Sequence, residues 1–167
     1  MRNKSMIRRV ASQGKIKGLA GQDFSYQDWR GANLSNTDLT GTNFNNAILS
    51  ESNLSEAKLN GANLMGADLK GANMSGSESR GATLSGAILS FAVLNKSDLS
   101  GAELSGAGMI GAKLNGANLN EANLSKAVLL NSDMTAANMS NANLKGALYN
   151  DKTIFPPTLP SVTMIKV

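Results

Sequence analysis

The stretch GANLMGADL, residues 61–69, decides the fold. Its triplet ANL at 62–64 is followed five residues later by ADL at 67–69. The repeating unit is a small residue, then Asn or Asp, then Leu, then two variable residues of which the second is often Gly. A short internal repeat of this kind predicts a solenoid, so it outweighs any local reading of the sequence.

The unit recurs at the same spacing through most of the chain. Counting in fives from Phe24 to Tyr149, the central residue is Leu, Met, Phe, Trp or Tyr everywhere except at Ser79. A strand alternates faces with period two, so the first and third residues of a unit share one face. Because the alternation restarts every five residues, each unit must turn a corner. Gly at the last position, as at Gly61 and Gly66, suits a tight turn with positive φ.

These units resemble the pentapeptide-repeat family, A-[N/D]-L-x-x, over about residues 22–150. The resemblance implies an all-β fold, a right-handed quadrilateral parallel β-helix in which residue n stacks on residue n+20. Residues 149–156, YNDKTIFP, are also similar to the ending of many cyanobacterial members. The chain then departs from their usual Gly-Phe-Asp-Pro continuation. The resemblance implies no particular activity.

We expect three segments: an N-terminal helix and lead-in cap at 1–20, the β-helix at 21–150 and a Pro-containing apolar tail at 151–167. Residues 3–13 are the expected short capping helix, because the first coil of a solenoid needs a cover. The first 20 residues carry six Lys or Arg and no acid. A basic membrane or nucleic-acid contact is therefore the alternative for this segment, with its candidate residues being Arg2, Arg8 and Arg9.

The composition excludes several kinds of chemistry. The chain has no Cys and no His, which removes disulfides, a thiolate nucleophile, and the commonest general base and transition-metal ligand. We therefore expect no enzyme activity, no cofactor and no metal. Residues 21–150 carry eight Lys or Arg against eleven Asp or Glu, and no aromatic residue accompanies the basic N-terminus, which argues against nucleic acid as a partner.

No apolar run could span a membrane, and we expect a cytoplasmic protein unless a targeting peptide has been removed.

One outer face of the expected rod carries large apolar residues in positions that are polar on the other three. Such a surface on a soluble protein needs a partner or a cover. The partner would be another protein or a second copy of the chain, and the cover would be the apolar tail. For the tail we expect Phe155 to cap the last coil, and the remainder either to fold back on this face or to pack in a dimer. The candidate interaction residues are Ile48, Ile88, Phe91, Ile110, Val128, Leu130 and Leu148.

Two further features have competing interpretations. Ser79 would leave a cavity or bind a water with a local bend, or else mark a functional kink. Glu78 and Asp98 would stack about 5 Å apart, a spacing that retaining glycosidases use. They lie on a flat outer wall near Lys58 and Arg80, which favours a solvated ladder of charges.

The sequence therefore predicts a non-enzymatic structural or protein-interaction module. The alternative comes from the family: some members mimic B-DNA and modulate type II topoisomerases. That role needs a strongly acidic surface, and this body is only weakly acidic.

Overall fold

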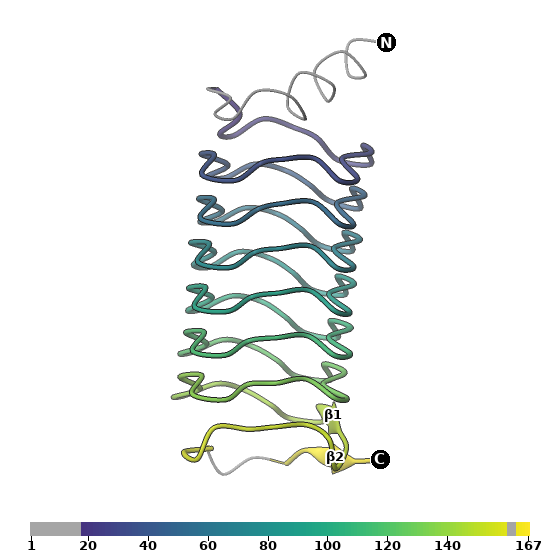
Figure 1. Ribbon diagram of the computed structural model, residues 1–167, viewed down its shortest axis with the longest axis vertical. Helices are drawn as coiled ribbons and strands as arrows, with labels where there is room; N and C mark the ends of the chain where they lie inside the picture. The colour runs from purple at the N-terminus through teal and green to yellow at the C-terminus, as the bar shows by residue number, and fades with distance from the viewer. Residues whose placement is uncertain (1–17, 160–162) are drawn as a thin grey trace.

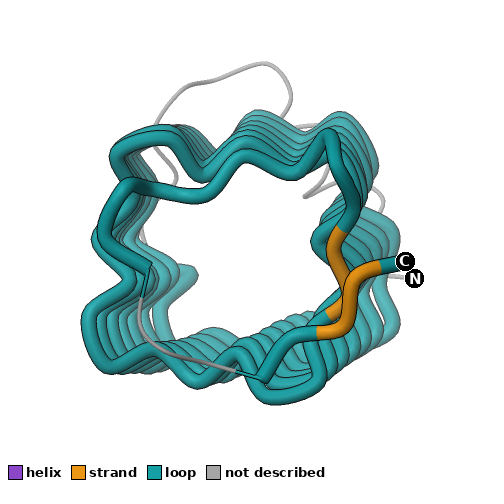
Figure 2. The backbone as a smooth tube through the Cα atoms, turned by 90° about the horizontal axis from the view of Figure 1, so that it is seen from below, coloured by secondary structure: helices purple, strands orange, loops and turns teal. Residues whose placement is uncertain are grey.

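The computed structural model describes residues 18–159 and 163–167, and its repeat body is a rod of evenly stacked coils (Figure 1). Seen along the rod, the coils superpose into a four-sided outline (Figure 2). Parallel bridges join residues twenty apart, as in Asp23 to Asn43 and Asn43 to Asn63. The expected four-sided closure is confirmed by this register.

The sides of the rod are too short for conventional strands. Within the described ranges, the named strands are β1 (Leu148–Tyr149) and β2 (Ile165–Lys166), and the other pairings are isolated bridges. Each coil still bonds to both neighbours. The Leu64 N–H donates to the Thr83 carbonyl at 2.7 Å, and the Asn63 N–H donates to the Thr42 carbonyl at 2.9 Å. Each side of a coil pairs with the next coil through one bridge residue, because only about three residues lie between successive turns.

Each unit turns its corner in a four-residue turn. The Ala67 N–H donates to the Leu64 carbonyl at 3.0 Å, and the third residue, Gly66, has φ 65°. Every fifth residue from 21 to 146 has positive φ in the same way. The expectation of Gly at corners is confirmed, but several corners hold other residues, including Phe91 with φ 61° and Ala136 with φ 57°.

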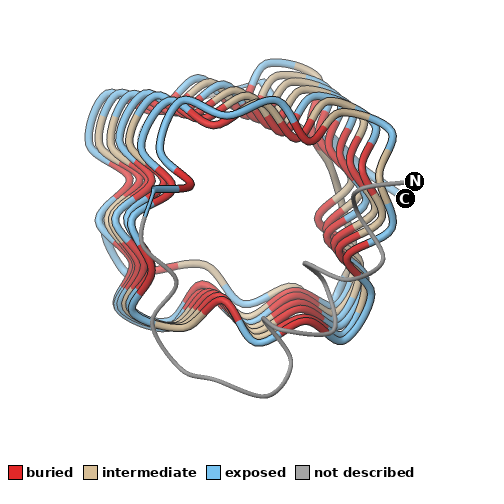
Figure 3. Ribbon diagram, turned by 90° about the horizontal axis from the view of Figure 1, so that it is seen from above, coloured by how far each residue is buried: buried red, intermediate tan, exposed pale blue. Residues whose placement is uncertain are grey.

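Leu and Ala side chains fill the interior, and Figure 3 shows the buried positions recurring along every side. At the N-terminal end of the described repeat, aromatic side chains take these interior positions. The ring of Trp29 lies edge-on to Phe24 at 4.8 Å and to Phe44 at 6.1 Å between centroids. The predicted helix at 3–13, with Arg2, Arg8 and Arg9, lies outside the described residues.

Ser79 does not interrupt the rod. Its N–H donates to the Asp98 carbonyl of the next coil at 2.7 Å. The N–H groups of Leu59 and Leu99, at the equivalent positions, likewise donate to the coil that follows each of them. The expected bend and the alternative of a kink are both wrong, because the ladder continues through this coil. The buried hydroxyl is instead paired within its own unit, 3.2 Å from the Ser77 hydroxyl.

The repeat ends with one extra residue. Asp133 pairs with Ile154 rather than with the residue twenty positions on, so the register lengthens by one. The added residue lies in a turn where the Thr153 N–H donates to the Asn150 carbonyl at 3.0 Å. Ile154 therefore points outward, and Phe155 packs against the core with its ring 5.6 Å from that of Tyr149. The expectation that Phe155 caps the last coil is confirmed.

The rest of the described tail adds a rung beneath the last coil. Strand β2 pairs in parallel with β1, with Ile165 opposite Leu148. The Ile165 N–H donates to the Ala147 carbonyl at 2.8 Å. Of the two alternatives for the rest of the tail, folding back on the apolar face is wrong, because the backbone of β2 pairs with the open edge of the last coil. Packing in a dimer stays a prediction.

Candidate protein-interaction surface

The register of the ladder brings distant apolar residues into one patch. On the side of the rod that carries the candidate residues, the outward positions of four consecutive rungs are Ile88, Gly108, Val128 and Leu148. Two residues further along each coil lie Ile110 and Leu130, and Phe91 occupies the adjoining corner. We call this set the apolar stripe: Ile88, Phe91, Ile110, Val128, Leu130 and Leu148.

The stripe is open to solvent. Ile88 is 47% exposed and Phe91 is 61% exposed, and the other four members are half-buried. The Phe91 ring lies over the corner of the next coil. A Cβ added to Gly111 would come within 2.8 Å of two ring atoms, so glycine is needed there. The result is a flat face with one protruding aromatic edge.

One of the seven candidate residues does not join the stripe. Ile48 is separated from Ile88 by Asp68, which occupies the rung between them. Ile165, which the repeat pattern does not predict, joins the stripe: it extends the column below Leu148 and is 50% exposed. The period could not reveal this residue because the tail pairs out of register with the repeat.

Two lysines border the stripe at its other corner. Lys126 precedes Val128 by two residues and has φ 58°, and its side chain lies over Gly146 in the next coil. The Lys126 N–H donates to the Lys145 carbonyl at 3.0 Å, so the two lysines are neighbours. Both are exposed, and neither forms an ion pair with any residue in the described ranges. One edge of the stripe is therefore positively charged.

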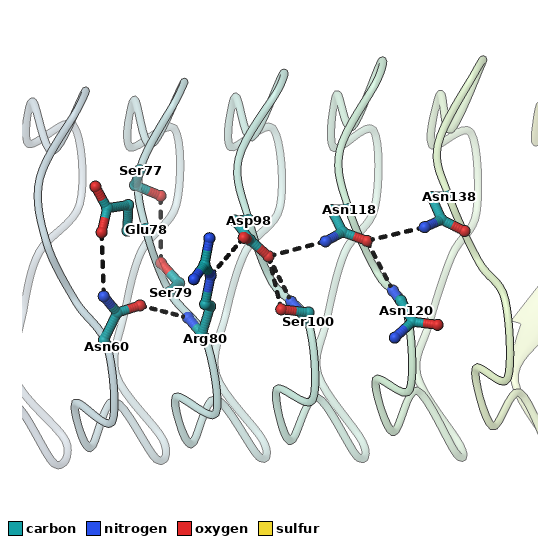
Figure 4. A network of polar contacts seen from close by, with 10 residues as sticks. All are labelled: Asn60, Ser77, Glu78, Ser79, Arg80, Asp98, Ser100, Asn118, Asn120 and Asn138. Atoms are coloured by element: carbon teal, nitrogen blue, oxygen red, sulfur yellow. Dashed lines mark hydrogen bonds and ion pairs between the residues drawn. The ribbon is translucent and has the colours of Figure 1, made fainter.

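The opposite wall is polar and internally satisfied (Figure 4). The Arg80 Nε donates to Asp98 Oδ2 at 2.6 Å, and the Asn60 Nδ2 donates to Glu78 Oε2 at 3.2 Å. Burial raises the pKa of Asp98, but hydrogen bonds from Ser100 and Arg80 outweigh it and the pKa is lowered. The expected ladder of charges on this wall is therefore confirmed for Asp98, which pairs with Arg80, whereas Glu78 forms no ion pair with any described residue.

Amide ladders continue this wall along the rod. The Asn118 Nδ2 donates to Asp98 Oδ1 at 3.1 Å, and the Asn138 Nδ2 donates to Asn118 Oδ1 at 3.1 Å. These side chains satisfy one another from coil to coil. In residues 18–159 and 163–167, no cluster of metal-ligating side chains is present, and no helix is long and apolar enough to cross a membrane.

The sequence matches the family model for pentapeptide repeats over residues 19–55, 47–78, 80–116 and 112–148. Among solved structures, a pentapeptide repeat protein of the cyanobacterium Cyanothece is 29% identical, with a TM-score of 0.43. That match covers 68% of this chain, and this chain spans 63% of that protein. HetL of the cyanobacterium Nostoc is described as involved in heterocyst differentiation regulation. It is 25% identical to this chain, with a TM-score of 0.38, and the match covers 100% of this chain and 92% of the HetL chain.

A pentapeptide repeat protein from the thylakoid lumen of Arabidopsis thaliana is 31% identical, with a TM-score of 0.29. The match covers 67% of this chain and 68% of the Arabidopsis chain. The comparison with curated proteins returns no match. The family match agrees with the stacking of residue n on residue n+20.

Proposed function

The chain belongs to the pentapeptide-repeat family, whose fold is the right-handed quadrilateral β-helix, and on that premise we propose that it is a non-enzymatic module that binds a protein partner through the apolar stripe. The observation that carries this proposal is the exposure of Ile88 and Phe91 on a side whose outward positions are apolar at most of its last rungs, with Gly108 between Ile88 and Val128. Contiguous exposed apolar area on a soluble protein is typical of an interaction site.

The position of Phe91 supports a binding role. A bulky residue with positive φ is an outlier, and the left-handed conformation costs about 1–2 kcal/mol for a residue with a Cβ. Glycine at this corner, as at Gly71 and Gly111, would turn the chain without that cost. The turn itself therefore does not favour Phe91. Its ring contributes instead to the exposed surface, and aromatic residues are enriched among the residues that dominate interface energetics.

The experiment compares three immobilised proteins in a native lysate of the source organism. They are the wild type, a stripe variant (Ile88→Lys, Val128→Lys, Leu130→Lys) and a control variant on the opposite wall (Asn120→Lys, Asn138→Lys, Ser140→Lys). Both variants add the same charge at outward positions, and circular dichroism confirms their folding. We expect mass spectrometry to find a protein held by wild type and control but lost from the stripe variant. Identical capture by all three would refute the proposal.

The DNA-mimic alternative gains no support from the walls. Lys58 lies between Asp38 and Glu78 in the ladder, and Arg80 pairs with Asp98. These contacts interrupt any continuous row of negative charge, which a mimic of the phosphate backbone would require. Topoisomerase subunits captured equally by all three proteins in the same experiment would favour this alternative over the stripe.

A further inference from the structure

The backbone around the stripe limits the kind of segment that can bind. Each rung from Ile88 to Leu148 is already paired with the coil above and the coil below. No strand edge is open between these rungs, so an added β-strand would find N–H and C=O groups to pair with only at the free edge of β2, at the end of the stripe. Recognition here must rest on side chains, which leaves a helix or a folded surface as the occupant.

The dimensions of the stripe favour one helix. From the rung of Ile88 to the rung of Ile165 there are four steps of about 4.8 Å, so the stripe is about 19 Å long. With a width of roughly 10 Å, it offers about 200 Å², well below the roughly 800 Å² per partner typical of stable interfaces between folded proteins. A second copy docking by this face alone is therefore disfavoured.

The spacing of the rungs also suits a helix. An α-helix rises about 5.4 Å per turn, close to the separation of successive coils, so each turn of a helix along the rod meets one rung. The mismatch amounts to only about 2 Å over the length of the stripe. Apolar residues one turn apart would then contact Val128 and Leu148 on adjacent rungs, and a residue about two turns from the Val128 contact would reach Ile88 beyond Gly108.

The charge at the edge specifies the flank of that helix. Lys126 and Lys145 are exposed beside the stripe and form no ion pair with the described residues. Acidic side chains on one flank of a bound helix would lie opposite them. We infer that the stripe binds an amphipathic helix of a partner protein, with an apolar face on Ile88, Val128 and Leu148 and an acidic flank beside Lys126 and Lys145. This inference rests on the proposed function and adds the chemistry of the partner.

The test uses two labelled peptides of about 18 residues, long enough to exceed the stripe. Both carry Leu on one helical face; one has Glu on its flanks and the other has Lys. Binding to the full chain is measured by fluorescence anisotropy at low salt. We expect the Glu-flanked peptide to bind about tenfold more tightly, as two exposed charge pairs allow. The Val128→Lys, Leu130→Lys variant should lose this binding, and Lys126→Glu, Lys145→Glu should invert the preference between the peptides.

The inference would be overturned if both peptides bind equally or if neither binds. It would also be overturned if the Lys126→Glu, Lys145→Glu variant keeps the preference for the Glu-flanked peptide. A dimer in sedimentation that the Val128→Lys, Leu130→Lys variant abolishes would also overturn it, since a second copy would then occupy the stripe. The proposed function can be judged separately. A lysate protein that is lost only from the stripe variant supports the interaction module even if these helices fail to bind.

Discussion

At the level of single residues, the Ser77–Ser79 pair shows how the repeat tolerates a polar substitution. Ser79 takes an interior position that Leu59 and Leu99 hold in the adjacent coils, and its hydroxyl pairs with that of Ser77. The cost of burying two hydroxyls is reduced because each provides the other's partner. The backbone ladder is unaffected, so the exception is confined to the packing of the core.

Restoring the repeat at this site should stabilise the protein. We expect Ser77→Ala with Ser79→Leu to raise the free energy of unfolding by about 1.5–3 kcal/mol, because a Leu side chain then fills the interior. Ser79→Leu alone should gain less, since it leaves the Ser77 hydroxyl buried without its partner at a cost of about 1–3 kcal/mol. Urea denaturation measures both. A double variant no more stable than wild type would contradict this account.

The corner residues make a second prediction. Ala136 is exposed with φ 57°, a conformation that costs a residue with a Cβ about 1–2 kcal/mol. Ala136→Gly should therefore raise the free energy of unfolding by about 0.5–1 kcal/mol, after the greater flexibility of glycine in the unfolded chain is deducted. The adjacent Ala137→Gly is the control. Ala137 is buried and has no positive φ, so its replacement should destabilise the protein, and the same sign for both variants would refute the explanation.

At the level of elements, the final turn determines what covers the open end of the rod. One extra residue before Ile154 shifts the register so that Ile154 takes the outward position and Phe155 packs against the core. Pairing of β2 with β1 then completes the end. The tail thus closes the core that the last coil would expose, and it leaves the apolar stripe uncovered.

Phe155→Ala should therefore lower the free energy of unfolding by about 1.5–3 kcal/mol, because it removes the ring that packs on Tyr149 and the core. The neighbouring Ile154→Ala should change it by less than about 0.5 kcal/mol, as expected for an outward side chain that is 51% exposed. Thermal or urea unfolding of the pair provides the measurement. Equal losses in the two variants would show that Phe155 does not act as the cap.

For the whole molecule, stability should depend on acid in a defined direction. The pKa values of Asp38 and Asp133 are lowered by hydrogen bonds from the hydroxyl and N–H of Thr40 and Thr135 respectively. The pKa of Asp23 is lowered mainly by the Ser25 N–H. Because the folded pKa lies below the ordinary value of 3.8, the unfolded chain binds more protons in acid. The contribution of these groups is complete above that value and is lost as the pH falls through the folded pKa.

The urea midpoint should accordingly stay level between neutral pH and about pH 5 and then fall below about pH 4. A series of denaturation curves at constant ionic strength measures it. A variant carrying Asp38→Asn and Asp133→Asn should show a shallower fall, since it retains fewer groups that bind protons on unfolding. A midpoint that is constant or rises down to about pH 3 would contradict the assignment.

The sequence by itself determined the architecture of this protein. The five-residue period fixes which side chains point inward, because side-chain direction depends on position within a unit and not on distant contacts. The four-sided closure that the family resemblance implies then places Ile88, Val128 and Leu148 on one side, so most of the candidate surface could be predicted. The same stacking also places Asp68 between Ile48 and Ile88, so the exclusion of Ile48 from the stripe was within reach of the sequence.

Only the tertiary structure decided how the rod ends and showed that corners without glycine still adopt positive φ. Phe91 and Ala136 adopt positive φ because pairing with both neighbouring coils imposes the turn, which overrides the preference of the residue. The tail joins the rod through β1 and β2, out of register with the repeat. Its position depends on an open ladder edge that exists only after the coils have stacked, so no local pattern in the sequence encodes it.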